Sequence, residues 1–124
     1  MFKKTLCRFA FPCLVALVTT TSVALAANWN ISFQKASTTT ANVSWEATSG
    51  VAYLVCWKLA SAGGDVCGAH EKTVTADNQS PDWFDGRMGT GITGLDTCNT
   101  SYKIRIKKKN FPLVYDTQDF YFPC

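Results

Sequence analysis

A strict alternation of apolar and basic side chains near the C-terminal end limits the possible folds of this chain more than any other feature. The apolar positions are Tyr102, Ile104 and Ile106, and the basic positions are Lys103, Arg105 and Lys107. Successive side chains of a β-strand point to opposite faces, so this pattern predicts a strand with one buried face. A chain that contains such a strand needs a second layer to cover it.

Similar short segments recur along the sequence, with turn residues between them. Alternation or β-branched runs predict strands at residues 29–33, 43–45, 53–59, 66–74, 92–95, 102–107 and 115–122. Residues 77–91 are interpreted as a long polar loop, and Phe111 is placed in the loop before the last strand. No segment has a convincing amphipathic helical period. The pattern predicts an all-β fold, a seven-stranded antiparallel β-sandwich.

The first 26 residues are predicted to be a secretory signal peptide. A basic start is followed by an apolar stretch and then by Ala24-Leu25-Ala26, a small-x-small cleavage site before Ala27. The alternative is a retained membrane anchor, but polar residues 19–22 interrupt the apolar run and a span needs about 20 apolar residues. We therefore expect one secreted domain, residues 27–124, which is extracellular, or periplasmic in a Gram-negative cell.

The charge of this domain is balanced. The whole chain has 12 basic and 9 acidic residues, a formal charge of +3. Three of the basic residues, Lys3, Lys4 and Arg8, belong to the predicted leader, which leaves nine of each sign. Net charge therefore gives no support to general polyanion binding, and any such contact has to come from local clustering.

Four cysteines remain in the predicted domain, and an exported chain favours their oxidation. Four cysteines permit three pairings. The strand layout favours Cys56 with Cys67, across a hairpin that contains Gly63-Gly64, and Cys98 with Cys124. A metal site is the competing interpretation, but the sequence lacks the C-x-x-C pair that is typical of zinc sites.

Several segments, in order, resemble a fibronectin type III domain. Trp45 on the second predicted strand, Tyr53-x-Val55-x-Trp57 on the third, Ile92-Thr93-Gly94-Leu95 and Thr100-x-Tyr102-x-Ile104-x-Ile106 match the motifs of that family. The resemblance covers nearly all of residues 27–124. It implies that the Tyr102 hydroxyl bonds to nearby backbone and pins a corner of the sandwich. It also implies a core built from Trp45, Tyr53, Val55, Trp57, Leu95, Tyr102, Ile104 and Ile106.

Two departures from the family pattern lie between Leu95 and Tyr102. The segment is one residue longer than usual, and the proline that commonly follows the leucine is absent. Cys98 occupies this corner instead, which suggests that a disulfide does part of the work of packing. In function, the resemblance implies adhesion or ligand recognition at a cell surface or in the surrounding medium.

The sequence contains no recognisable catalytic motif. His70 is the only histidine, and nothing in the sequence pairs it with a nucleophile or a metal. The carboxylates Asp77, Asp82 and Asp85 do not have the spacing of the helix-loop-helix calcium loop. We therefore expect no enzyme, no cofactor and no metal site.

Two groups of residues are candidates for binding. The first is a basic stripe for polyanion contact, which Lys58 on the neighbouring strand would extend; the alternative is that these charges only keep an exposed strand face soluble. The second is a set of aromatic anchors, whose alternative is a role as caps of a thin core. The stripe comprises Lys103, Arg105, Lys107, Lys108 and Lys109, and the anchors are Trp83, Phe84 and Phe111.

The sequence therefore favours a secreted, non-catalytic module for an unidentified extracellular protein or glycan. One alternative is a structural subunit that assembles into a filament or coat by pairing of edge strands. Another is an inhibitor or accessory factor of a secreted hydrolase, with the Trp83-Phe84 segment as a plug.

Overall fold

The computed structural model describes residues 25–124. The predicted signal peptide lies outside the described residues except for its last two, Leu25 and Ala26. These form β2 and pair with β10. The predicted cleavage site before Ala27 therefore falls directly after β2, and the Ala27 amide donates a hydrogen bond of 2.8 Å to the carbonyl oxygen of Tyr115.

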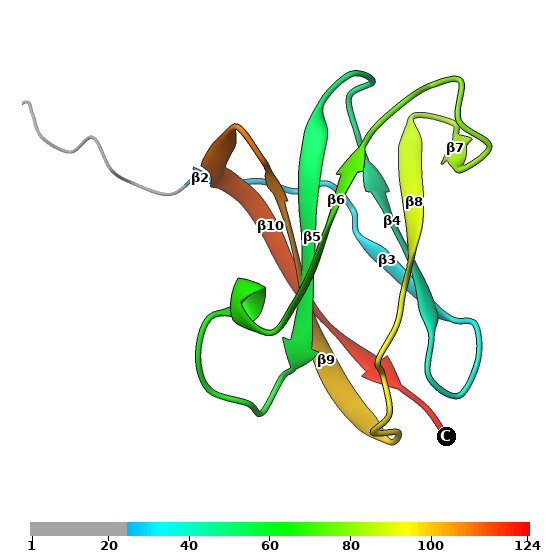
Figure 1. Cartoon of the computed structure of the whole chain (residues 1–124), viewed down its shortest axis with the longest axis vertical. Coiled ribbons are helices and arrows are strands. Elements are labelled where there is room, and N and C mark those ends of the chain that lie inside the picture. The colour runs from blue at the N-terminus through cyan, green and yellow to red at the C-terminus, as the bar shows by residue number, and fades with distance from the viewer. Residues whose placement is uncertain (1–24) are drawn as a thin grey trace, which may run out of the picture.

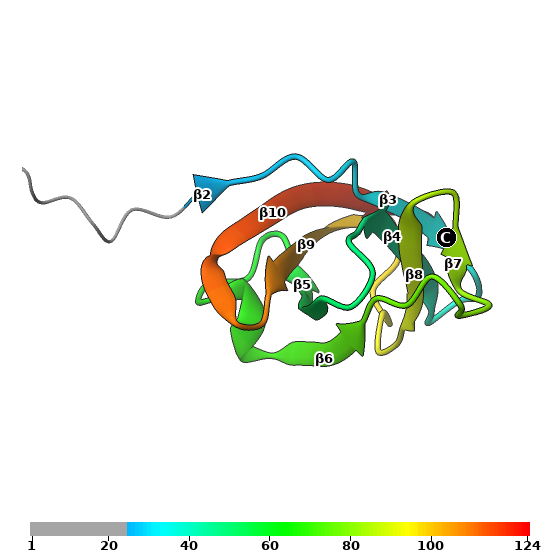
Figure 2. The same cartoon turned by 90° about the horizontal axis from the view of Figure 1, so that it is seen from above.

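The described chain is an all-β sandwich of two sheets that face each other across the core (Figures 1 and 2). One sheet has the order β2-β10-β9-β5-β6, and the other has the order β3-β4-β8-β7. All neighbouring strands are antiparallel except β2 and β10. The expected fold class, an all-β sandwich, is confirmed, and two short strands, β2 and β7, add to the seven that were predicted. The strands are β2 (Leu25–Ala26), β3 (Ser32–Lys35), β4 (Ala41–Glu46), β5 (Ala52–Leu59), β6 (His70–Thr75), β7 (Trp83–Phe84), β8 (Arg87–Ile92), β9 (Thr100–Lys108) and β10 (Phe111–Phe122).

The core lies between the sheets and is centred on Trp45. This indole is fully buried and packs edge-on against the Tyr53 ring, with 5.5 Å between ring centroids. Trp57 is also buried, and its Nε1 donates a hydrogen bond of 2.9 Å to the carbonyl oxygen of Thr93. Each of the eight residues expected in the core is buried. Alternation along β4, β5 and β9 thus directs the apolar side chains inward.

The corner before β9 has the expected tyrosine contact. The Tyr102 hydroxyl accepts a hydrogen bond of 3.4 Å from the Thr97 amide, five residues earlier in the chain. Both predicted disulfides are confirmed, with Cys98 joined to Cys124 and Cys56 joined to Cys67. The first bridge holds the end of the chain after β10 against the start of β9.

Several predicted strand limits were wrong, each for a local reason. The first strand begins at Ser32 rather than at Trp29, because Asn30 has a φ of 50° and breaks the extended backbone. The fourth begins at His70, since residues 66–68 form a short 3-10 helix, η2 (Val66–Gly68). Phe111 lies at the start of β10 rather than in a loop, before an irregularity in the pairing with β9.

The largest error concerns the segment interpreted as a polar loop. Residues 83–92 form a hairpin, β7 and β8, whose two-residue turn is Asp85-Gly86. Both turn residues have positive φ, 52° and 79°, as a type I′ turn requires. The fifth predicted strand therefore lies earlier in the chain, at Arg87–Ile92 rather than at 92–95.

Residues 60–69, which include η2, form the covering loop. They fold back over the outer face of β5 and its neighbours instead of forming a simple hairpin (Figure 1). The Cys56–Cys67 disulfide therefore joins the outer face of β5 to this loop, and Cys56 is fully buried beneath it. Among the described residues, no helix has the length and apolar character needed to cross a membrane.

Candidate functional site

The β9–β10 tip, residues 107–113, brings together apolar and basic candidates at one turn. Phe111 is 66% exposed and Leu113 is 48% exposed. Lys107 and Lys108 end β9, and Lys109 follows in the turn, where its amide donates a hydrogen bond of 2.9 Å to the carbonyl oxygen of Ala52. The tip therefore presents exposed apolar side chains beside three cations on a turn that is tied to β5.

A shallow cavity of about 330 Å³ adjoins the tip. Its walls come from the turn before β5, the end of β6 and the tip itself. The aromatic ring of Phe111 and the stem of Lys108 give this cavity an apolar side with a cationic rim. The lining residues are Gly50, Val51, Ala52, Thr75, Lys108, Asn110 and Phe111.

The rest of the predicted basic stripe is engaged in contacts within the sheet. Lys103 forms an ion pair of 2.9 Å with Asp119 on β10. Arg105 donates a hydrogen bond of 2.9 Å to the Thr117 hydroxyl, and its guanidinium lies 4.5 Å from the centroid of the Tyr115 ring. Arg105 also lies 3.6 Å from a carboxylate oxygen of Asp65 in the covering loop. These two cations therefore hold the sheet face together.

Among residues 25–124, the salt bridges engage none of the three lysines of the tip. The predicted stripe thus divides into an engaged part, Lys103 and Arg105, and an unengaged part at the tip. The expected extension by Lys58 was wrong, because this side chain is buried under the covering loop. Its Nζ donates a hydrogen bond to the carbonyl oxygen of Ala62.

The sequence left open whether Trp83 and Phe84 are exposed anchors or caps of the core, and the structure gives each residue a different position. Trp83 is partly buried and packs against the core, opposite Met88 of β8. Phe84 is 79% exposed, opposite Arg87, next to the Asp85-Gly86 turn. Adjacent residues of a strand point to opposite faces, so only one of the pair is able to cap the core. Figure 1 places β7 on the opposite side of the molecule from the β9–β10 turn.

His70 and the carboxylates of the 77–85 segment do not assemble a site. His70 begins β6, is exposed and stacks on Trp57, with 5.6 Å between ring centroids. Across the described part of the chain, no three His, Cys, Asp or Glu side chains are placed to hold a metal ion.

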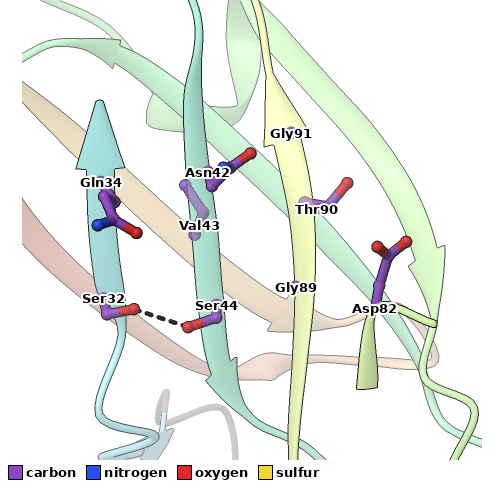
Figure 3. Close-up of a pocket in the computed structure, with 9 residues that line it drawn as sticks. All are labelled: Ser32, Gln34, Asn42, Val43, Ser44, Asp82, Gly89, Thr90 and Gly91. Carbon is purple, nitrogen blue, oxygen red and sulfur yellow. Dashed lines mark hydrogen bonds between the residues drawn. The ribbon is translucent and has the colours of Figure 1, made fainter. Parts of the chain in front are cut away.

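A polar groove of about 290 Å³ lies on the outer face of the β3-β4-β8-β7 sheet (Figure 3). The cross-strand partners Ser32, Ser44 and Gly89 form one row, and Gln34, Asn42 and Gly91 form the next. Asp82 closes the groove beyond β8. Sequence reasoning missed this site. Its available signal was the pair of glycines inside an otherwise extended segment, which often marks a close approach by a ligand.

The arrangement of the sheets is similar to that of solved structures. The chain matches a myokine structure with a TM-score of 0.51 and 11% identity, over 80% of this chain and 98% of that one. It also matches the chicken CNTN1 FN1-FN3 domains with a TM-score of 0.50 and 22% identity, over 77% of this chain and 30% of that one. The chain has the fibronectin type III fold.

At these identities, the fibronectin type III fold is what the chain shares with its structural neighbours. No protein-family model matches the chain, and no curated protein sequence matches it. Its binding surfaces therefore have to be argued from its own residues.

Proposed function

We propose that this chain is an exported, non-catalytic binding module that recognises a protein or glycan partner at or outside the cell surface. Residues 1–26 are its signal peptide, and residues 27–124 are the released domain. The two disulfides support an oxidising destination, because such bridges persist in secreted and periplasmic proteins. The fibronectin type III fold supports a role in binding or adhesion.

The β9–β10 tip is the contact surface in this proposal. One observation supports this assignment. Phe111 and Leu113 are exposed beside three lysines that, among the described residues, form no salt bridge. Exposed aromatic side chains act as anchors in interfaces when a pocket or rim surrounds them. The lysines favour a partner with acidic groups around its apolar contact, through steering of the encounter.

A capture experiment with matched variants tests this assignment. The oxidised protein is immobilised, incubated with material from its native surroundings, and compared with the double variant Phe111→Ser, Leu113→Ser. We expect partner capture to fall by about tenfold or more, because two interface anchors are lost. The melting temperature should stay nearly unchanged, since both side chains are exposed in the folded chain.

Phe84→Ser is the matched control, because Phe84 is more exposed than Phe111 and lies on the other side of the molecule. Capture should survive this change. Equal capture by the wild type and by the tip variant would contradict the assignment of the contact surface.

The inhibitor or accessory-factor hypothesis is the second candidate, and the exposure of Phe84 at 79% favours it. In that case Phe84 alone is the plug, because Trp83 packs against the core. Loss of partner capture in Phe84→Ser, with the tip variant unaffected, would favour this candidate over the first.

A further inference from the structure

The two glycines of the polar groove are not explained by the fold. Gly89 and Gly91 lie inside β8, and neither has a positive φ. A Cβ built on Gly89 would meet no atom closer than 3.6 Å, and one on Gly91 would meet only the Asn42 Oδ1 at 3.8 Å. A methyl group therefore fits at both positions. Glycine weakens a strand by roughly 0.5–1 kcal/mol relative to alanine, and neither the backbone angles nor the contacts of a Cβ require glycine here.

Their effect is to clear the floor of the groove. Gly89 and Gly91 are cross-strand partners of Ser44 and Asn42, so all four positions face outward, while Val43 between them is fully buried in the core. Because positions 89 and 91 carry no side chains, the backbone of β8 lines the groove between β4 and Asp82, beside the Thr90 side chain (Figure 3).

The walls of the groove carry uncharged hydrogen-bonding groups and one carboxylate. Ser32 and Ser44 share a hydrogen bond of 2.6 Å, which fixes one hydroxyl pair at the edge of the groove. Within the described residues, the side chains of Gln34, Asn42 and Asp82 make no hydrogen bond to protein. Carboxamides both donate and accept, and a carboxylate accepts, so these groups match the hydroxyls of a sugar.

The charged groups beside the groove are one carboxylate and cations that already bond to protein. Asp82 supplies the carboxylate, and the Lys72 Nζ donates a hydrogen bond of 3.0 Å to the Gly91 carbonyl oxygen. Within residues 25–124, no three His, Cys, Asp or Glu side chains are placed to hold a metal ion. The guanidinium of Arg87 at the end of the groove is already engaged, with hydrogen bonds of 2.6 Å to the Asn30 carbonyl and 3.1 Å to Ser44. The lining is mostly polar, which disfavours an apolar ligand.

We propose that the outer face of the β3-β4-β8 strands binds an uncharged oligosaccharide, which lies over Gly89 and Gly91 and bonds to Gln34, Asn42 and Asp82. The volume of about 290 Å³ is close to the lower end of the range for small-molecule sites, roughly 300–1,000 Å³. The site is on the sheet opposite to the β9–β10 tip, so it does not depend on the proposed tip contact.

Chemical shift mapping of the oxidised, isotope-labelled protein tests the site. The probes are maltohexaose, chitohexaose and mannohexaose, each at up to about 5 mM, since a shallow polar groove should bind in the millimolar range. The expected result is that at least one sugar shifts the backbone amides of Gly89 and Gly91. Absence of such shifts with all three sugars would overturn the proposal.

Two variants test whether sugar binding depends on the groove or on another part of the molecule. Gly91→Val fills the floor with a β-branched side chain, which suits a strand, so we expect weaker sugar binding by tenfold or more with equal or higher thermal stability. Gly63→Val in the covering loop is the matched control, because nothing lies within 4 Å of its built Cβ. This control should bind as the wild type does.

Asn42→Ala provides a second route that leaves the backbone of β8 unchanged, and it should also weaken binding. Retention of wild-type affinity in both Gly91→Val and Asn42→Ala would overturn the proposal. Shifts of the same amides with an extended peptide such as acetylated hexathreonine, and not with the sugars, would also overturn it.

Discussion

The outer face of the β2-β10-β9-β5-β6 sheet is covered over β5 and its neighbours by residues 60–69, whereas the outer face of the β3-β4-β8-β7 sheet is open. On the covered side, three contacts attach the covering loop: the Cys56–Cys67 disulfide, the Lys58 to Ala62 hydrogen bond and the Arg105 to Asp65 ion pair. On the open side, serine hydroxyls, carboxamides and two glycines face solvent.

This difference indicates that one face of a small domain contributes to stability while the other remains available for recognition. The core between two sheets of this size is thin, so additional burial and a disulfide on one face contribute to stability. The face without such a cover keeps backbone and side-chain polar groups accessible to a ligand. The contrast predicts that substitutions on the covered face cost stability and that those on the open face do not.

The largest expected effect comes from removing the disulfide of the covered face. Cys56→Ala with Cys67→Ala should lower the free energy of unfolding by about 3 kcal/mol, because an unbridged denatured chain gains entropy. Urea denaturation measures this change, and hydrogen exchange should show faster opening of residues 60–69. A loss below about 1 kcal/mol would mean that the covering loop is held by its other contacts.

A smaller loss is expected for Arg105→Met. The substitution keeps much of the apolar stem but removes the hydrogen bond to Thr117, the contact with the Tyr115 ring and the ion pair with Asp65. Together these should reduce the free energy of unfolding by about 1 kcal/mol. Thermal denaturation checks this value, and an unchanged melting temperature would remove Arg105 from the contacts that hold the covering loop.

The smallest effect is expected on the open face. The Asn42 side chain is exposed and makes no hydrogen bond to the described protein. Asn42→Thr replaces it with threonine, which has a high strand propensity. The free energy of unfolding should change by no more than about 0.5 kcal/mol, in either direction. Urea denaturation beside the Arg105→Met variant gives the comparison. A loss as large as that of Arg105→Met would break the contrast between the two faces.

Alternation in the sequence predicted the inner faces well. Trp45 and Tyr53 were assigned to the core from spacing and family resemblance, and both are buried. The disulfide partners were also predicted, because strand order restricts which cysteines lie close together. The turn Asp85-Gly86 was a readable hairpin signal that the interpretation of residues 77–91 as a loop overlooked.

The candidate surfaces were predicted less completely. Phe111 and Lys109 are exposed at one turn, and Lys107 and Lys108 are partly exposed there. Lys58, in contrast, is buried, and Lys103 and Arg105 are paired within the sheet. The sequence did not reveal these pairings, since Asp65 and Asp119 lie far from their partners along the chain. The groove over Gly89 and Gly91 was missed for the same reason, because four separate segments line it.

The sequence by itself determined the strand period, the apolar interior and the four cysteines that close two bridges, because these depend on local spacing and on the order of the strands. Only the tertiary structure decided which charges are free, which of Trp83 and Phe84 is exposed, and that one sheet face is covered while the other is open. Those outcomes depend on contacts between segments distant in the chain, and such contacts form only when the loops return across the sheets.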